Sequence, residues 1–187
     1  IKIGVDTLTL SATPIPRTLN LALSGARSIS VIHTPPPGRL PIKTFVLPYQ
    51  QSTVKEAIER EFRRKGQVFY VYNRVETIEA RANQLLKLIP GLRLRYLHGQ
   101  MDAKSIEETM TAFLQKEFDV LLATTIIESG MDIPNVNTIL VERADFFGLS
   151  QLYQLRGRIG RREAQGYAYL FYKDSSTLTP TASKRLM

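Results

Sequence analysis

Short apolar runs alternate with amphipathic stretches between residue 43 and residue 172. The runs are rich in β-branched and aromatic residues, as in Gln67–Tyr72 (QVFYVY), and this composition is typical of buried strands. We expect strands at Lys43–Leu47, Gln67–Tyr72, Leu92–Leu97, Asp119–Ala123, Thr138–Val141 and Tyr167–Tyr172.

Helical periodicity fills the intervals between these runs. Val54, Ile58 and Phe62 recur at four-residue steps beside Ala57, and Gly66 follows as a stop signal, so this stretch predicts an amphipathic helix. Further apolar helix faces are expected at Ile78, Ala82, Leu85 and Ile89, at Ile106, Met110 and Phe113, and within a helix over Gly148–Arg158. Strands that alternate with helices predict an α/β fold with a mostly parallel sheet, helices on both faces and right-handed crossovers.

The first 32 residues carry only one strand, expected at Val5–Leu10, and one helix, expected over Pro16–Ser24. Because one strand and one helix cannot bury a core, we expect residues 1–32 to be a stub of another sheet, and the chain, which starts at Ile1, to be a piece of a longer protein. Five prolines indicate a linker over residues 33–48. The main domain is expected over 43–172. A polar tail over 173–187 should be frayed or begin a further element.

Composition narrows the classes of function. The chain has 187 residues, 25 Lys+Arg against 17 Asp+Glu and a formal net charge of +8, which favours a polyanionic partner such as nucleic acid. The lack of cysteine excludes disulfides, thiolate zinc sites and cysteine nucleophiles, and two histidines argue against a multi-histidine metal centre. No apolar run reaches the roughly 18 residues of a membrane span, and the N-terminus lacks a signal-peptide pattern, so we expect no membrane partner and a cytoplasmic location.

The most unusual stretch is Gln154–Arg161 (QLRGRIGR), which Arg162 follows. Its arginines offer bidentate bonds to phosphate, and its glycines let a backbone approach closely. An arginine that reaches a γ-phosphate stabilises charge in the transition state. A solvated basic helix end would have the same composition. We look for these contacts beyond the carboxyl ends of the strands, where parallel sheets bind ligands.

Other loops carry weaker signals. Thr124, at the end of a predicted strand, can hold an anion, and Asp132 can bind a ribose hydroxyl or cap a turn. Asn73 and Arg74 are a phosphate contact or surface charge, and His98 is a catalyst or an ordinary loop residue. The chain contains no phosphate-loop motif, GxGxxG, HExxH or GxSxG, and its two histidines give no triad.

Taken together and in order, five stretches are far more specific: SAT (11–13), YNR (72–74), HGQM (98–101), TTIIESGMDIP (124–134) and QLRGRIGR (154–161). This order resembles motifs III, IV, IVa, V and VI in the C-terminal half of superfamily 2 helicases and translocases. Within them, SATPIPRTLNLALSG and RADFFGLSQLYQLRGRIGR resemble the bacterial transcription-repair coupling factors. RecG-type branch-migration helicases are similar through SATPIPRT and FGLSQL…QLRGRIGR, but they fit less well at YNRV and HGQM.

The resemblance implies a RecA-like fold and a set of site residues. By match to motif VI, Arg158 and Arg161 are the arginine fingers, with Gln154 beside them. By match to motif V, Gly130 and Asp132 face the ribose and the domain interface. The expected nucleic-acid contacts are Asn73, Arg74, His98, Gly99 and Thr124. Ser11 and Thr13 match the motif that couples the nucleotide site to the DNA site.

The resemblance also implies a partner domain, because the phosphate loop and the acidic box are absent and belong to a first RecA-like domain. ATP and Mg²⁺ are then cofactors of the full-length protein, and the missing domain holds Mg²⁺. The expected partners are double-stranded DNA and, through the full-length bacterial protein, RNA polymerase and repair factors. We expect the chain to drive translocation only as half of a motor and to lack ATPase activity alone. The alternatives are a RecG-like branched-DNA helicase domain and a non-catalytic basic module that binds nucleic acid.

Overall fold

The structure is a computed structural model that describes residues 30, 32, 40–124, 136–160, 164–174, 176 and 178–186. The chain divides into two compact units, Ile1–Pro35 and Pro36–Met187, and the fold below is that of the second unit. Several sequence predictions lie outside the described residues: the strand at Val5–Leu10, the helix at Pro16–Ser24, and the site residues Ser11, Thr13, Gly130, Asp132 and Arg161.

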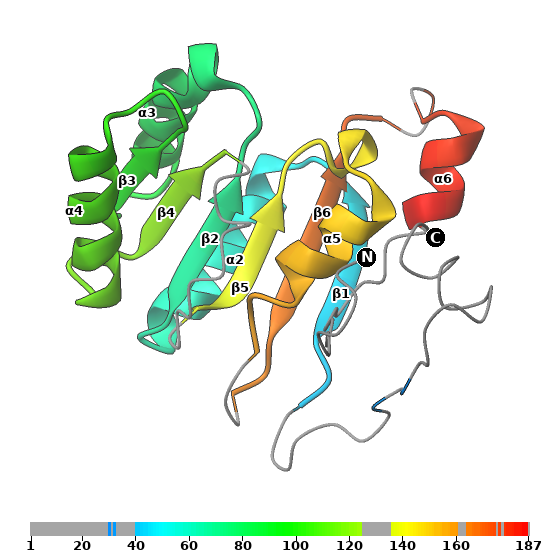
Figure 1. Cartoon of the computed structure of the whole chain (residues 1–187), viewed down its shortest axis with the longest axis horizontal. Coiled ribbons are helices and arrows are strands. Elements are labelled where there is room, and N and C mark those ends of the chain that lie inside the picture. Colours follow the sequence, from blue (N-terminus) through cyan, green and yellow to red (C-terminus); the bar gives the residue numbers. More distant parts are fainter. Residues whose placement is uncertain are drawn as a thin grey trace, which may run out of the picture. The chain divides into compact units, whose positions relative to one another are not determined.

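A parallel sheet forms the centre of this unit, with the strand order β1-β6-β5-β2-β4-β3 (Figure 1). The strands are β1 (Lys43–Pro48), β2 (Gln67–Val71), β3 (Leu94–Leu97), β4 (Val120–Ala123), β5 (Val136–Val141) and β6 (Tyr167–Tyr172). At the centre of the sheet, Phe69 of β2 pairs with Ile139 of β5 on one side and with Leu121 of β4 on the other. The sheet predicted from the apolar runs is therefore present, and the pairs between its strands are all parallel.

Helices cover both faces of the sheet, as the sequence predicted. They are α2 (Gln51–Arg63), α3 (Ile78–Leu88), α4 (Ala103–Leu114), α5 (Leu149–Arg156) and α6 (Pro180–Leu186), with short 3-10 turns η1 (Val75–Thr77) and η3 (Ala144–Phe146). One core cluster joins α2 and α3 to the sheet, and the other joins α4, α5 and α6 to its opposite face. In Figure 1, α5 crosses in front of the sheet and α2 passes behind it.

The apolar core is built around the residues of the predicted strands. Phe69, Leu121 and Ile139 face the cluster on the α4 and α5 side, and Tyr70, Leu122 and Leu140 face the other. Residues that alternate along one strand therefore serve opposite faces, and the central strands are buried on both. Within the α4 side, the Phe113 ring lies between Phe69 and Phe118, with centroid distances of 5.4 and 5.0 Å.

The C-terminal tail is more ordered than its polar composition suggested. Its described part contains α6, whose Ala182 and Leu186 are buried, and Leu186 belongs to the core cluster on the α5 side. Thr179 caps this helix, since its hydroxyl accepts a hydrogen bond of 3.1 Å from the amide of Ala182. Of the two expected alternatives, a frayed tail or the start of a further element, the described part of the tail fits the second.

The predicted buried face of α2 is also partly wrong. Val54, Ala57 and Ile58 are buried as expected, but Phe62 is 43% exposed and its neighbour Glu61 is fully buried. In a helix of 3.6 residues per turn, position 61 lies about 20° from position 54, whereas position 62 lies about 80° away. The centre of the buried face therefore falls on a carboxylate.

Glu61 lies at the amino ends of β2 and β5. The hydroxyl of Thr138 donates a hydrogen bond of 2.7 Å to Glu61 Oε2, and Arg64 Nη1 lies 3.9 Å from the same oxygen. A Cβ atom on Gly66 would lie 1.8 Å from Glu61 Oε1, so a larger residue here would force this carboxyl group to move. Burial raises the pKa of Glu61, against the lowering effect of the Thr138 hydrogen bond and of Arg64.

We predict that Glu61→Gln makes the chain more stable than the wild type at pH 8, and that this difference shrinks as the pH falls to 5. A carboxyl group whose pKa is raised by folding binds its proton more tightly in the folded state, so wild-type stability decreases as the pH rises through that pKa. Glutamine carries no charge to desolvate. Urea unfolding followed by circular dichroism measures both free energies of unfolding.

The matched control is Glu59→Gln on the same helix, because the Glu59 side chain is 44% exposed and forms an ion pair with Lys55. Its effect should be small and nearly independent of pH. A Glu61→Gln difference that grows as the pH falls would contradict the assignment.

Candidate functional site

Three of the loops predicted to bind nucleic acid lie side by side at the carboxyl ends of β2, β4 and β3. Asn73 and Arg74 follow β2, Thr124 follows β4, and His98 and Gly99 follow β3. Backbone hydrogen bonds connect neighbouring strand ends, from the Tyr72 amide to Ala123 (2.9 Å) and from the Thr124 amide to Leu97 (3.2 Å). The structure thus brings these predicted residues together, while their binding of nucleic acid stays a prediction.

The three loops differ in what they offer a ligand. Asn73 and Arg74 are exposed, whereas Thr124 is 5% exposed and offers a ligand little beyond its hydroxyl, because its amide bonds to Leu97. His98 lies in a turn that the Met101 amide closes by donating to the His98 carbonyl (3.1 Å), and its ring stacks on Tyr96 with centroids 6.2 Å apart. The His98 Nδ1 atom is buried and has no hydrogen-bond partner among the described residues.

A buried polar network at the same edge was missed by the sequence analysis. Glu142, directly after β5, accepts a hydrogen bond of 2.7 Å from the hydroxyl of Tyr70 and bonds through its other oxygen to Arg81 of α3. Arg81 also donates to the Tyr49 hydroxyl (3.0 Å), and its guanidinium lies over the rings of Tyr49 and Tyr72, 5.1 and 5.3 Å from their centroids. This network ties β1, β2, β5 and α3 together.

The electrostatics of the network favour a fixed ion pair. Burial is the largest single influence and lowers the pKa of Arg81. The Glu142 carboxylate and, after it, the hydroxyl groups of the neighbouring tyrosines together outweigh burial, so the pKa of Arg81 is raised. Burial, followed by the charge of Glu142, raises the pKa of Tyr70 well above its usual value, so this phenol stays a hydrogen-bond donor. A glutamate and an arginine separated by 61 positions gave no local signal in the sequence.

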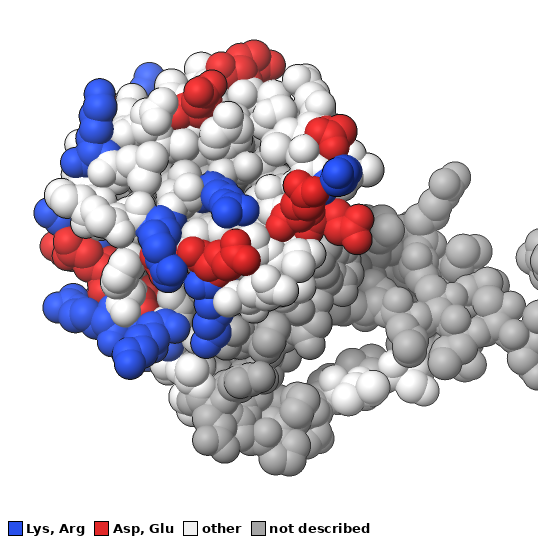
Figure 2. Space-filling view, turned by 90° about the vertical axis from the view of Figure 1, so that its left-hand side faces the viewer, with Lys and Arg blue, Asp and Glu red and all other residues white. Residues whose placement is uncertain are grey.

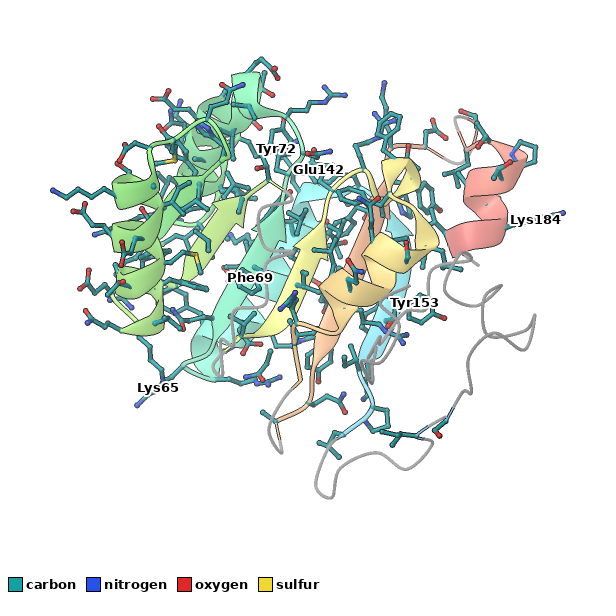
Figure 3. The ribbon with its side chains drawn as sticks, viewed as in Figure 1. Lys65, Phe69, Tyr72, Glu142, Tyr153 and Lys184 are labelled. Carbon is teal, nitrogen blue, oxygen red and sulfur yellow. The ribbon has the colours of Figure 1, made fainter. Side chains whose placement is uncertain are left out.

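Most residues of the network line a hollow of about 560 Å³, which we call the carboxyl-edge hollow. Its lining residues are Tyr49, Tyr72, Asn73, Arg74, Arg81, Glu142, Arg143, Phe146, Phe147 and Lys173. Figure 3 shows Tyr72 and Glu142 close together at the upper edge of the sheet. The predicted residues Asn73 and Arg74 thus share a hollow with residues after β5 and β6.

The arginine-rich stretch lies elsewhere, which corrects the expectation that it would lie beyond the carboxyl ends of the strands. Helix α5 ends at Arg156, two residues earlier than predicted, and the chain then leads into the amino end of β6. At Gly160, with φ +69°, a Cβ atom would lie 3.1 Å from Ile42 and 3.8 Å from Gly166, the residues directly before β1 and β6. Arg158 is therefore near the opposite edge of the sheet from Asn73.

Local structure explains how this stretch presents its polar groups. Leu155 and Ile159 are buried and anchor it to the core, while Gln154 is exposed and Arg158 is half-buried. The amide of Gly157 makes the last α-helical bond, to the Tyr153 carbonyl (2.9 Å), and the amide of Arg158 then donates to Leu155 (3.1 Å) in a tighter turn that ends the helix. Arg161 and Arg162 lie outside the described residues.

Charges of both signs lie on the face of the molecule that Figure 2 shows. On the face with α3, α4 and β3, basic and acidic side chains are interspersed (Figure 2). Among the described residues, no group of three or more acidic or histidine side chains could hold a metal ion. Nor does any helix in the described part of the chain have the length and apolar character needed to cross a membrane.

Comparison with known proteins assigns the chain to a family. The helicase conserved C-terminal domain matches residues 50–163, which is more than half of the chain. The transcription-repair-coupling factor of Staphylococcus haemolyticus (strain JCSC1435) is 54% identical over 99% of the chain, and that of Staphylococcus aureus (strain USA300) is 53% identical over all of it. The chain spans only 16% of the length of these relatives.

Solved structures agree on the fold. The structure of RecG bound to a three-way DNA junction is 37% identical, with a TM-score of 0.77 over 97% of the chain and 24% of RecG. Saccharomyces cerevisiae Dbp5 bound to RNA and ADP BeF3 aligns over 94% of the chain and 48% of Dbp5, with a TM-score of 0.65 and 18% identity, a likeness of fold alone. The predicted RecA-like α/β fold is confirmed.

We predict that Arg81→Met lowers the free energy of unfolding by about 3 kcal/mol, because it leaves the Glu142 carboxylate buried without its cation. Adding Glu142→Gln to this variant should recover part of the loss, since the buried charge is then gone. Chemical denaturation of the chain, followed by circular dichroism, measures each change.

Lys87→Met is the matched control, because Lys87 is exposed near the end of the same helix. It should change stability by no more than about 0.5 kcal/mol. Wild-type stability in Arg81→Met would show that the ion pair does not hold this edge of the sheet together.

Proposed function

Because the chain belongs to the helicase conserved C-terminal domain family, we propose that it is the second motor domain of an ATP-dependent translocase on double-stranded DNA. Identity of 53–54% with transcription-repair-coupling factors supports a role in coupling transcription to DNA repair. We propose that the intact protein displaces stalled RNA polymerase and recruits repair factors, while this domain supplies half of the motor.

The observation that carries the proposal is the separation of two groups of polar residues on one sheet. Asn73, Arg74 and Thr124 lie at the carboxyl ends of the strands, and Arg158 lies near their amino ends. With a rise of about 3.3 Å per residue, a six-residue strand keeps the two groups roughly 20 Å apart. A motor needs this arrangement, because one surface must hold the nucleic acid while another senses the nucleotide.

The amino-edge group has the chemistry of a nucleotide-phosphate site. Gln154 and Arg158 supply amide and guanidinium donors, and the match to motif VI adds Arg161. In the closed motor, these arginines would reach the ATP held by the first domain and stabilise the charge that develops on its γ-phosphate. Gly130 and Asp132 would line the ribose side, and the first domain would hold most of the Mg²⁺ coordination.

The carboxyl-edge group has the chemistry of a backbone contact. Arg74 and Asn73 would reach phosphates from the loop after β2, and the Thr124 hydroxyl would add a neutral phosphate contact. His98 and Gly99 would bring the β3 loop to the same strand of DNA. Ser11 and Thr13, by their match to motif III, would couple the nucleotide site to this track.

The likeness to RecG, at 37% identity and a TM-score of 0.77, favours a second candidate function, that of a branched-DNA helicase domain. Substrate preference separates the two. Faster ATP hydrolysis or displacement on stalled transcription complexes supports the coupling factor, and a preference for three-way junctions supports the RecG-like activity.

We predict that Arg161→Ala in the intact protein lowers the ATPase kcat by about 10³-fold, because an arginine finger is worth roughly 10³–10⁵ in rate. The Kd for duplex DNA should change only a few-fold, since the arginine serves the nucleotide. A coupled ATPase assay and fluorescence anisotropy with labelled duplex measure the two effects.

Arg156→Ala is the matched control in the same stretch, because the Arg156 guanidinium lies over the Tyr153 ring at 4.7 Å and has no proposed role with ATP. It should keep its ATPase activity. If Arg161→Ala hydrolyses ATP normally but binds DNA weakly, the stretch is a phosphate-backbone module and the finger assignment is wrong.

We also predict that this chain alone hydrolyses no ATP and binds duplex DNA weakly, with an affinity that falls as salt rises. The proposed phosphate loop and acidic box lie on another domain, and phosphate contacts release counterions. Steady-state ATPase assays and salt titrations of DNA binding test both statements. Robust turnover by the chain would contradict the proposal.

A further inference from the structure

Two cations at the mouth of the carboxyl-edge hollow lack acidic partners among the described residues. Arg74 follows β2 and Lys173 follows β6, and both side chains line the hollow and are exposed. By contrast, Arg81 is bonded to Glu142, and the Arg143 guanidinium bonds Asp145 at 2.9 to 3.2 Å. The mouth therefore carries positive charge that the described part of the protein does not neutralise.

An exposed aromatic ring stands beside these cations. Phe146 is 67% exposed, which is unusual for a phenylalanine, and the Arg143 guanidinium covers one side of its ring at 4.0 Å. The ion pair with Asp145 and the contact with the ring thus fix the Arg143 guanidinium against one face of Phe146. The rest of the ring remains open to a ligand.

The backbone at Arg143 is strained in a way that serves this presentation. Its φ of +56° is in the left-handed region, where an arginine has no intrinsic preference. Strained residues of this kind persist where the surroundings hold them, and they concentrate at functional sites. Here the strained turn leads from the Glu142 ion pair directly into η3, which carries Phe146.

We propose that the carboxyl-edge hollow binds one unstacked nucleotide, with its base against Phe146 and its phosphate between Arg74 and Lys173. A volume of about 560 Å³ is within the range of ligand sites and exceeds what a bare phosphate needs. Phosphate contacts need no exposed aromatic ring, whereas an unpaired base has a face that stacks on one. The proposal rests on the proposed function, because it adds a subsite beside the Asn73–Arg74 loop.

The test compares two DNA ligands with the intact protein that carries this chain: a blunt duplex, and the same duplex with a short single-stranded tail. Fluorescence anisotropy gives both Kd values. We expect the wild type to bind the tailed duplex more tightly, and Phe146→Ala to lose about tenfold on the tailed duplex alone, in line with the loss of one base-stacking contact. Phe146→Trp should restore the preference.

Leu149→Ala is the matched control, because Leu149 is 48% exposed, lies three residues further along and does not line the hollow. It should bind both ligands as the wild type does. If Phe146→Ala also binds the tailed duplex like the wild type, the subsite is wrong while the proposed DNA binding stands. If the wild type binds neither DNA, the proposed function fails as well.

A second pair of variants tests the phosphate contact. Lys173→Ala should reduce the slope of log Kd against log salt by about one on the tailed duplex, whereas Lys184→Ala, an exposed lysine outside the hollow, should leave it unchanged. An unchanged slope in Lys173→Ala would overturn this contact. A competition experiment with dAMP identifies the ligand of the hollow. If dAMP removes the preference for the tailed duplex, a free nucleotide also occupies the site; if it does not, the site binds a nucleotide of a DNA strand.

Discussion

The uniform direction of the strands is the constraint on which the rest of this structure depends. Since β1 to β6 all run parallel, every loop that follows a strand lies at one edge of the sheet, and every segment that precedes a strand lies at the other. The YNR, HGQM and Thr124 stretches follow strands, whereas QLRGRIGR precedes β6. Parallel pairing alone thus places the two groups of residues at opposite edges, and the central strands between them are buried on both faces.

Strand β5 links the two edges most directly. At its amino end Thr138 bonds Glu61 of α2, and just after its carboxyl end Glu142 bonds Tyr70 and Arg81. Between these polar contacts its side chains are almost all buried. Buried polar contacts at both ends favour a single register, because a shift by one residue would strand a carboxylate in the core. The chain from β5 then continues through η3 and α5 to Arg158, so a fixed β5 also fixes the arginine stretch.

The sequence predicted the strands well because apolar runs bounded by turns leave few alternatives. The sequence analysis missed the buried charged residues. Glu61 occupies the centre of the α2 face, yet a carboxylate reads as a surface residue, so the four-residue spacing selected Phe62 instead. Glu142 and Arg81 were missed for the same reason, since their partners become visible only when distant segments meet.

Net charge is a poor measure of the nucleic-acid surface of this domain. Several arginines are engaged within the fold: Arg60 with Tyr169, Arg81 with Glu142, Arg93 with Asp119 and Arg143 with Asp145. These arginines are paired with carboxylates or hydrogen-bonded to a tyrosine. On the face that Figure 2 shows, basic and acidic side chains are interspersed. What distinguishes Arg74 and Lys173 is not their sign but their position, on either side of a hollow that also exposes an aromatic ring. Recognition of a nucleotide requires that combination of phosphate-binding cations and a stacking surface, and a count of basic residues does not reveal it.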